Sequence, residues 1–340
     1  MAVVKAGAYG HGLEEVARAL AGEDMAFFGV ANVGEARRIA DAGVTVPIYL
    51  LGATWQDERA EVVARGWVPC LSSLDEAVAY DRLAAAAGTR VTAHLAVDTG
   101  MGRGGFVPAA LAENFAALEA LEHVVIDGIG SHLPSADEDA EFTREQFARF
   151  AQIVGQLGGP QRFRWRHLAN SAGMMAYDNT PFNLVRPGLM LYGIASVESG
   201  DWPAPKNVMT LKSRVALVRE LPPGHGVSYG RDYVTTRPTR VATVGIGYGD
   251  GYPRSLSGSG AEVVIRGCRY PLIGRVTMDQ VMVDVTADEA ISSGDEVELF
   301  GPHVRVDEVA RKAGTIAWEI LTGITPRVAR RYHAAGVASS

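Results

Sequence analysis

The sequence predicts an α/β fold: a (β/α)8 (TIM) barrel over residues 1–205, followed by a mostly antiparallel, β-strand-rich domain over residues 206–340. Three observations support this prediction. Short apolar segments recur about every 20 to 40 residues in the first part of the chain, as parallel strands do in βα units. Helical patterns of apolar residues lie between several of these segments. Beyond residue 205 the pattern changes to short strands separated by Gly and Pro turns.

The barrel prediction rests on eight segments rich in apolar and β-branched residues, which is typical of strands buried on both faces. These segments are Ala2–Val4, Phe27–Val30, Pro47–Leu51, Val68–Leu71, Val91–Val97, Val124–Ile129, Phe163–Leu168 and Leu184–Tyr192. An open, doubly wound sheet is the structural alternative, because the number of strands does not prove closure. The chemistry of barrels lies at the C-terminal strand ends, and Lys5 follows the first predicted strand.

Helices are predicted between these strands from apolar residues at helical spacing. One begins at Leu13, one covers Glu35–Ala42 and another covers Thr143–Leu157. A further helix opens with the capping box formed by Ser73 and Glu76, two side chains that can satisfy free backbone N–H groups of a first turn.

The second domain is predicted from five segments that alternate or run apolar between turns. They are Arg214–Leu221, Arg240–Ile246, Glu262–Ile265, Gln280–Val285 and Glu296–Phe300. A helix near Val306–Ala313 precedes the terminal segment. The Pro-, Gly- and Ser-rich stretch near residues 197–206 is the predicted domain boundary.

Composition excludes several classes of protein. With a net charge of −7 over 340 residues, general nucleic-acid binding is not expected. The two cysteines, Cys70 and Cys268, provide neither a disulfide framework nor zinc-ligand spacing. No apolar run approaches the ~18 residues of a membrane helix, and the N-terminus lacks the pattern of a signal peptide. We therefore expect a cytoplasmic protein without a metal, membrane or nucleic-acid partner.

Lys5 is the first candidate for chemistry. It ends a short apolar strand and is followed by a glycine-rich turn that contains Tyr9. A lysine surrounded by apolar residues can lose its proton and become a nucleophile towards a carbonyl. Considered alone, such a lysine is more often an ordinary surface residue, so the interpretation depends on the rest of the chain.

Four other side chains follow predicted strands or lie in glycine-rich turns. Arg103 ends the segment Asp98–Arg103 and offers a planar, charged fork that suits a carboxylate. His132 also follows a predicted strand, but a lone histidine is more often a structural residue than a functional one. Arg186 lies in an apolar run, where a buried guanidinium must be paired, so a structural ion pair is its alternative. Tyr248 lies among glycines and could belong to a tight hairpin.

Together these segments resemble the alanine racemase family, whose members use pyridoxal 5'-phosphate (PLP) to interconvert L- and D-alanine. The resemblance runs from Ala2 to about Arg330. The motifs that carry it are the Lys5 block, Asp98–Arg103, Ala169–Ser171, the Arg186 segment, Gly247–Gly251 and Met278–Gln280. Agreement of all of them, in this order, is not expected by chance.

The resemblance implies how PLP is bound. Lys5 corresponds to the lysine that holds the cofactor as an imine. The other cofactor-binding positions correspond to Asn170 and, at the phosphate, to Tyr9, Ser171, Gly188 and Leu189. Arg186 would face the pyridine nitrogen, which then stays unprotonated because arginine can only donate; this should suppress transamination. His132 would link Arg186 to Tyr248.

The resemblance also implies the catalytic groups. Racemisation removes a proton from one face of the α-carbon and delivers one to the other, so two opposed bases are the natural solution. These would be Lys5 on the D-face and Tyr248 on the L-face, with Arg103 and Met278 binding the carboxylate of a small amino acid. In this family the tyrosine comes from the partner subunit, which implies a head-to-tail homodimer. The product would supply D-alanine for peptidoglycan.

Four features depart from the family pattern. Gly7 stands at a position where Asp or Asn is usual in the family. Ala96 stands at a position where the family often has a lysine that supports the arginine corresponding to Arg103. Trp318 stands at a position where a tyrosine is usual. The family also has a strand and a helix before the lysine, whereas this sequence begins four residues before Lys5. Two alternatives follow: a racemase for serine or a broader set of amino acids, and a PLP-binding protein whose activity is disabled by the short N-terminus.

Overall fold

The computed structural model describes residues 1–195, 197 and 205–333. The chain divides into two units, and most of the first precedes residue 192. The second unit takes Tyr9–His11, Tyr192–Ile194 and the chain from Lys206 onward. Most of the stretch near 197–206, where the sequence predicts the domain boundary, lies outside the described residues.

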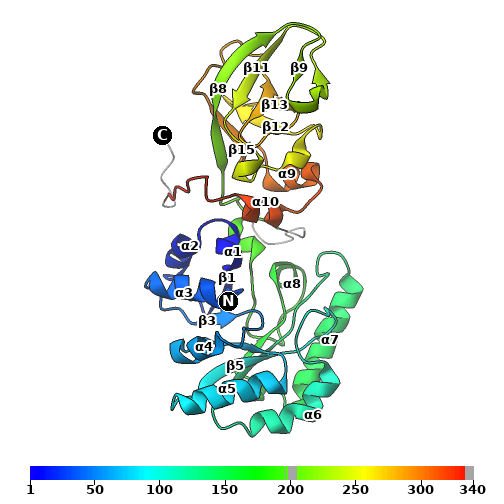
Figure 1. Ribbon diagram of the computed structural model, residues 1–340. Coiled ribbons are helices and arrows are strands. Elements are labelled where there is room, and N and C mark those ends of the chain that lie inside the picture. The colour runs from blue at the N-terminus through cyan, green and yellow to red at the C-terminus, as the bar shows by residue number, and fades with distance from the viewer. Residues whose placement is uncertain (196, 198–204, 334–340) are drawn as a thin grey trace. The chain divides into compact units, whose positions relative to one another are not determined.

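The first unit contains two parallel sheets (Figure 1). One has the order β1 (Ala2–Val3), β2 (Phe28–Val30), β3 (Ile48–Leu50). The other has the order β4 (Cys70–Leu71), β5 (Val91–Ala96), β6 (Val124–Gly130), β7 (Trp165–His167). All pairs within them are parallel. Parallel pairing is the arrangement that the alternating sequence pattern predicts.

Backbone contacts between the two sheets close the barrel. A parallel bridge joins Tyr49 to Val68 just before β4, and the Leu50 N–H donates to the Val68 carbonyl over 2.9 Å. On the other side Leu184 bridges to β7, and the Val3 N–H donates to the Pro187 carbonyl over 3.0 Å. The extended segment 184–187 therefore takes the place of the eighth strand. The predicted barrel is confirmed, and the open sheet is excluded.

The eighth predicted strand, Leu184–Tyr192, is too long. Its second half is the 3-10 helix η2 (Leu189–Tyr192). The turn follows from hydrogen bonds to a residue distant in the sequence, because the N–H groups of Gly188 and Met190 both donate to the Ser171 hydroxyl rather than to a neighbouring strand. The apolar run thus continues from extended chain into a 3-10 helix, and the spacing of its apolar residues does not reveal this change.

Helices surround the strands of this unit (Figure 1). They are α2 (Leu13–Leu20), α3 (Val33–Asp41), α4 (Arg59–Arg65), α5 (Leu74–Ala86), α6 (Pro108–Glu119), α7 (Ala140–Gln156) and α8 (Ser171–Ala176), with the 3-10 helix η1 (Pro160–Arg162). The element labelled α1 (Lys5–Tyr9) is a turn with left-handed backbone angles rather than an α-helix. The predicted start at Ser73 is confirmed, since its Oγ accepts from the Glu76 N–H. The Glu76 carboxylate reaches one residue further back than a capping box requires, to the Ser72 N–H.

The second unit is built on a closed, six-stranded antiparallel barrel. Its strands, in spatial order, are β11 (Thr239–Val244), β14 (Val281–Asp284), β13 (Cys268–Ile273), β12 (Glu262–Ile265), β15 (Glu296–Phe300) and β8 (Leu211–Leu221). A hairpin of β9 (Gly226–Val227) and β10 (Tyr233–Val234) and the helices α9 (Val306–Ala313) and α10 (Ala317–Gly323) complete it. The five predicted strands and the predicted helix are present, whereas β9, β10 and β13 are not predicted from the sequence.

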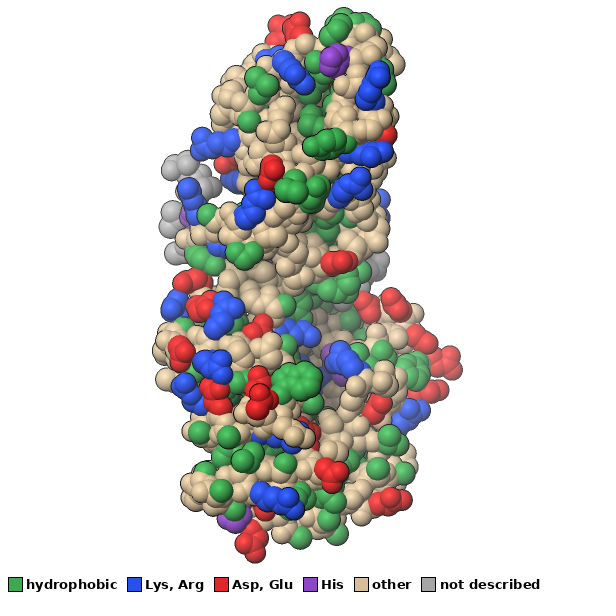
Figure 2. All heavy atoms as spheres, in the orientation of Figure 1, with side chains coloured by type: hydrophobic (Ala, Val, Ile, Leu, Met, Phe, Trp, Pro, Cys, Tyr) green, Lys and Arg blue, Asp and Glu red, His purple; other side chains and the backbone are tan. Residues whose placement is uncertain are grey.

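The surface carries both signs of charge. Figure 2 shows Lys and Arg side chains interspersed with Asp and Glu on the visible face, without one continuous basic patch. None of the helices in the described part of the chain has the length and hydropathy that crossing a bilayer requires.

The interior of the first barrel combines an apolar cluster with buried polar rings. Met1, Phe27, Tyr49, Val68, Cys70 and Leu184 form a buried cluster. Beside it lie the fully buried His94 and the nearly fully buried His167. A Cβ added to Gly130 would lie 2.2 Å from an atom of the His167 ring. The glycine in β6 is therefore required by the space that the ring occupies.

We expect the variant Gly130→Ala to lower the free energy of unfolding by about 1–3 kcal/mol, because the added methyl group forces the His167 ring or the backbone to move. Urea unfolding of the full chain measures this. The matched control is Gly22→Ala, where nothing lies within 4 Å of the added Cβ. A Gly130→Ala protein as stable as that control would show that the barrel interior is not packed as described.

Candidate active site

Lys5 lies two residues after the end of β1 and begins a turn with unusual backbone geometry. Ala6, Gly7, Ala8 and Tyr9 have φ angles of 53°, 62°, 56° and 51°, so four successive residues are left-handed. This conformation costs roughly 1–2 kcal/mol for each residue other than glycine. Such strain persists only where the surroundings hold it, and it is commonly found at functional sites.

The carboxylate of Glu35 holds this turn in place. Its Oε1 accepts from the Gly7 N–H over 3.1 Å, and its Oε2 accepts from the Ala31 N–H over 2.9 Å. Glu35 is buried and follows the helix cap Asn32 in α3. The sequence pattern predicts only that Glu35 belongs to a helix. Its link to the Lys5 turn is not visible in that pattern, because it joins residues 28 positions apart.

The surroundings of Lys5 favour its neutral form. Burial is the main cause of the lowered pKa of Lys5, and the cationic Arg103 lowers it further. The Glu35 carboxylate opposes this and raises the pKa, while Arg186 lowers it. The amine is thus available as a nucleophile or base at a lower pH than an exposed lysine.

We expect the variant Arg103→Met to raise the pKa of Lys5, because a cationic neighbour that disfavours the ammonium is removed. The amine of Lys5 then becomes reactive only at higher pH. The rate of its modification by an amine-specific reagent, followed by peptide mass spectrometry from pH 6 to 11, measures the shift. A profile that stays unchanged in the variant would contradict the described proximity of the two charges.

The loop that ends at Arg103 is held by its own residues. The Asp98 carboxylate accepts from the N–H groups of Gly100, Met101 and Gly102 over 2.8–2.9 Å. Burial raises the pKa of Asp98, but these three donors outweigh it and the net shift is downward. Arg103 itself is exposed, and no hydrogen bond or ion pair joins it to another described residue. Its guanidinium is free to bind an anion.

Arg186 lies inside the barrel and is 6% exposed. Its guanidinium donates to the carbonyls of Ser131 (2.5 Å) and Leu168 (3.2 Å). It also donates to the Nδ1 atoms of His167 (2.5 Å) and His132 (3.1 Å). Burial lowers the pKa of His132 to about 3, with further contributions from Arg186, Arg103 and Lys5, so His132 is neutral. Among the described residues Arg186 forms no ion pair, so the predicted alternative of a structural ion pair is not observed.

Ser171 lies at the start of α8, after the last residue of β7 and the cap Asn170. Its Oγ accepts from the N–H groups of Gly188 (3.0 Å) and Met190 (3.3 Å). Within the described residues, the hydrogen of this hydroxyl has no acceptor. The Asn170 amide is used by the fold, because it accepts from Gly173 and donates to Leu133. Leu189 is buried beside this turn.

The second unit brings Tyr248 and Met278 together. Tyr248 begins the 3-10 helix η4 (Tyr248–Asp250) and is 42% exposed. Its N–H donates to the Thr277 carbonyl over 3.0 Å, and the Gly249 N–H donates to the Met278 carbonyl over 2.8 Å. This close packing of two backbones explains the glycines on either side of Tyr248.

Arg327 supports the same pair of segments and is not singled out by the sequence. Its guanidinium lies 3.4 Å from the Asp250 carboxylate and 2.7 Å from that of Asp279. Asp250 in turn accepts from the Gly247 N–H at the start of the turn. The arginine thus ties together the segments that carry Tyr248 and Met278.

The predicted residues therefore form two groups. The first unit contains Lys5, Arg103, His132, Asn170, Ser171, Arg186, Gly188 and Leu189, and the second contains Tyr9, Tyr248 and Met278. Burial raises the pKa of Tyr9, whose ring centroid lies 4.9 Å from that of Tyr192. Trp318 is half-buried in α10, and Ala96 ends β5.

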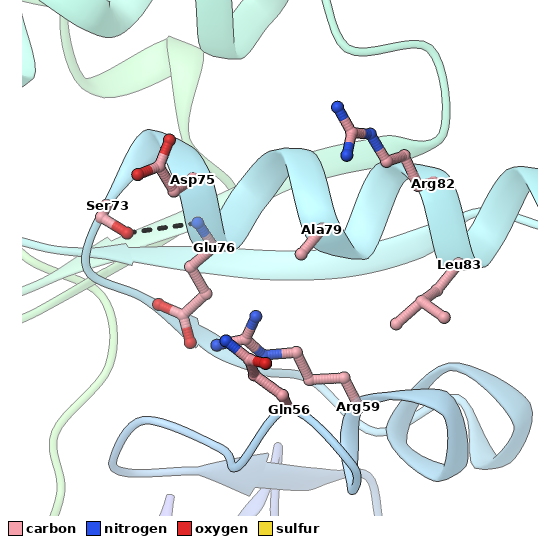
Figure 3. Close-up of a pocket in the computed structure, with 8 residues that line it drawn as sticks. All are labelled: Gln56, Arg59, Ser73, Asp75, Glu76, Ala79, Arg82 and Leu83. Atoms are coloured by element: carbon pink, nitrogen blue, oxygen red, sulfur yellow. Dashed lines mark hydrogen bonds between the residues drawn. The ribbon is translucent and has the colours of Figure 1, made fainter.

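Two surface cavities of the first unit are lined by other residues than the Lys5 group. One, of about 510 Å³, lies between α4 and α5 (Figure 3). Its lining residues are Gln56, Arg59, Ser73, Asp75, Glu76, Ala79, Arg82 and Leu83. The other, of about 530 Å³, borders the Asp98–Gly102 loop beside Arg149. In Figure 3 the Glu76 carboxylate points towards Arg59 and Gln56, and burial raises its pKa. No predicted site residue lines either cavity.

Comparison with known proteins assigns both parts of the chain to one family. Residues 1–196 match the family described as alanine racemase, N-terminal domain, and residues 208–332 match the alanine racemase C-terminal domain. The chain belongs to the alanine racemase family. The resemblance predicted from the motifs is thereby confirmed.

Relatives in the family match nearly the whole chain. The alanine racemase of Symbiobacterium thermophilum is 40% identical, over 98% of this chain and 90% of its own. The alanine racemase of Halothermothrix orenii is 38% identical, over 98% of this chain and 89% of its own. Among solved structures, the alanine racemase from Streptomyces lavendulae has a TM-score of 0.90 at 34% identity, covering 98% and 90% of the two chains. A Bartonella henselae alanine racemase with covalently bound pyridoxal phosphate has a TM-score of 0.88 at 32% identity, covering 98% and 92%.

Proposed function

We propose that this chain is a PLP-dependent racemase that interconverts L-alanine and D-alanine. The observation that carries the proposal is Lys5, a deprotonation-prone amine at the C-terminal end of a barrel strand, placed near two arginines. The family assignment supports it, as does the similar alanine racemase from B. henselae, whose structure contains covalently bound pyridoxal phosphate.

The residues of the first unit fit the cofactor. PLP has an aldehyde, a phosphate, a phenolic oxygen and a pyridine nitrogen that accepts hydrogen bonds. Lys5 supplies an amine for the aldehyde. Ser171 supplies a hydroxyl whose hydrogen has no acceptor in the described part of the chain, so it can donate to the phosphate. Arg186 supplies donors for the nitrogen. Asn170, Gly188 and Leu189 of the first unit, and Tyr9, which belongs to the second unit, complete the set that the family resemblance assigns.

Racemisation then depends on groups that move protons. When bound, PLP withdraws electrons from the substrate α-carbon and makes its proton removable. Lys5, whose pKa is lowered mainly by burial, takes or returns the proton on the D-face, and Tyr248 does so on the L-face. Arg186, which only donates, leaves the pyridine nitrogen unprotonated, which favours return of the proton to the α-carbon. In the proposed link from Arg186 through His132 to Tyr248, the first contact is supported by the 3.1 Å between the Arg186 guanidinium and Nδ1 of the neutral His132.

The substrate is a small amino acid in this proposal. Arg103, which has no partner among the described residues, binds its carboxylate together with the backbone at Met278. We further propose a homodimer in which each subunit provides Tyr248 to its partner, a cytoplasmic location, and supply of D-alanine to peptidoglycan. The exposure of Tyr248 and Met278 in the second unit supports a role at an interface.

Ala96 and Trp318 favour serine or a broader set of amino acids as a second candidate. Ala96 offers no charged side chain to support Arg103, and Trp318 is larger than the tyrosine usual in the family. A panel of both enantiomers of alanine, serine, valine and lysine, each assayed for inversion, separates these functions. The proposal expects the highest kcat/KM with alanine. A higher kcat/KM with serine would replace alanine by serine, and PLP binding without inversion of any substrate would indicate a non-enzyme.

A further inference from the structure

Two buried histidines continue the hydrogen bonds of Arg186 into the barrel. Arg186 Nη1 lies 2.5 Å from Nδ1 of His167, and Nε2 of His167 lies 3.0 Å from Nδ1 of His94. His94 comes from β5, His167 from β7, and Arg186 from the segment that takes the place of the eighth strand. The three side chains therefore form one line of contacts through the interior.

The chemistry of arginine fixes the protons along this line. A guanidinium donates hydrogen bonds and cannot accept them, so Nδ1 of His167 must carry a lone pair. The proton of a neutral His167 then lies on Nε2 and donates to Nδ1 of His94. By the same logic the proton of His94 lies on its Nε2. That atom is buried and has no hydrogen-bond partner among the described residues.

Both rings are neutral. Burial, followed by the charge of Arg186, lowers the pKa of His94 to about 3. The same two causes hold the pKa of His167 well below its usual range. Neutral imidazoles bind the guanidinium through lone pairs and leave its positive charge uncompensated, whereas a carboxylate would neutralise it.

The surroundings are shaped to hold the two rings. A Cβ on Gly128 would lie 2.6 Å from the His94 ring, and one on Gly130 would lie 2.2 Å from the His167 ring. The rings of Phe27 and Tyr49 lie 5.5 Å and 5.0 Å from that of His94, between centroids. These neighbours leave the imidazoles little freedom to turn over.

We propose that His94 is a positioning residue: it fixes the tautomer of His167, which keeps Nδ1 available as an acceptor and thereby holds the Arg186 guanidinium in place. This inference rests on the proposed function, in which Arg186 faces the pyridine nitrogen of PLP. Without an acceptor at His94, His167 has either an unsatisfied buried N–H or a proton on Nδ1, where it meets a donor of Arg186. Either result loosens Arg186.

The first test needs neither PLP nor activity. In the full chain labelled with 15N-histidine, NMR distinguishes protonated from lone-pair ring nitrogens. We expect both His94 and His167 to carry the proton on Nε2 and to stay neutral between pH 5 and 8. A proton on Nδ1 of His167, or a doubly protonated ring, would overturn the proposal. Failure of the proposed function would leave this result unchanged, because the tautomers are measured in the apoprotein.

Variants test the consequence. His94→Phe fills a similar volume without an acceptor, and His94→Asn restores an acceptor oxygen near the place of Nδ1. We expect His94→Phe to weaken PLP binding roughly five- to tenfold, the effect of one lost hydrogen bond, and to lower kcat for alanine with KM unchanged. His94→Asn should restore both. The control is His123→Phe, since His123 lies at the barrel surface next to Asp81.

The outcomes separate positioning from bulk packing. A simple packing role would make His94→Asn, the smaller residue, worse than His94→Phe in both PLP affinity and stability to urea. Equal PLP affinity for His94→Phe and the wild type would also overturn the proposal. If His94→Phe does not fold, the NMR tautomers of the wild type and of His94→Asn still decide, because Asn must leave the proton of His167 on Nε2.

Discussion

The variant Lys5→Ala is expected to lose both the absorbance near 420 nm that marks a lysine-bound pyridoxal cofactor and the racemisation of alanine in either direction. Removal of the amine takes away the covalent attachment and one of the two proposed bases at once. General-base catalysis alone contributes about 10²–10⁴-fold, so a loss beyond ~10³-fold is expected. Absorption spectra after addition of PLP, and polarimetry with each enantiomer, provide the measurements.

The control for this variant is Lys212→Ala. Lys212 lies in β8 and pairs with Glu296 at the surface of the second unit, so its loss should change neither spectrum nor turnover. A Lys5→Ala variant that still racemised alanine would refute the assignment of Lys5 as the cofactor-binding lysine and D-face base. Retention of the absorbance near 420 nm would place the covalent attachment on one of the remaining lysines.

Tyr248→Phe is expected to lower kcat/KM by about 10²–10⁴-fold in both directions. The two directions must fall equally, because the enantiomers have the same free energy in water. Exchange of the α-proton with solvent, in contrast, should remain for only one of the two enantiomers. In D2O the variant should still exchange the α-proton of D-alanine through Lys5 and should no longer exchange that of L-alanine. NMR of the recovered alanine distinguishes the two.

Tyr229→Phe is the matched control, since Tyr229 lies in the same unit and is 72% exposed. It should retain exchange with both enantiomers. Symmetrical loss of exchange in Tyr248→Phe would mean that the tyrosine acts on binding rather than as the L-face base. Loss of exchange with D-alanine alone would reverse the assignment of the two faces.

The barrel can be predicted from the sequence because the signals for its strands and helices lie within short stretches of the chain. Parallel strands buried on both faces appear as apolar runs, and the helix cap at Ser73 lies only three residues from the Glu76 N–H from which it accepts. The eighth segment departs from its prediction because a distant residue intervenes. Its apolar run continues past Pro187, but the Ser171 hydroxyl, 17 residues away, accepts from Gly188 and turns the chain into a 3-10 helix.

Residues that act across the barrel are harder to predict. Glu35 lies on a helix but holds the Lys5 turn, and Arg327 lies near the end of the chain but joins Asp250 to Asp279. His94 and His167 lie within apolar strands, where a lone histidine is most simply interpreted as a core residue. Their role follows only from distances between residues 73 positions apart. The family motifs supply the proposed roles of Lys5, Arg103, His132 and Arg186, whose close grouping the structure describes.

The most direct test of the proposed reaction is α-proton exchange with the unmodified protein. Purified chain with PLP is incubated in D2O with L-alanine or D-alanine, and the inversion and deuterium content of each are followed together by NMR on a chiral derivative. We predict that both enantiomers reach a one-to-one mixture, and that the inverted product carries deuterium at the α-carbon from the first turnover. Bound PLP with no deuterium incorporation into either enantiomer would contradict the proposed two-base racemisation.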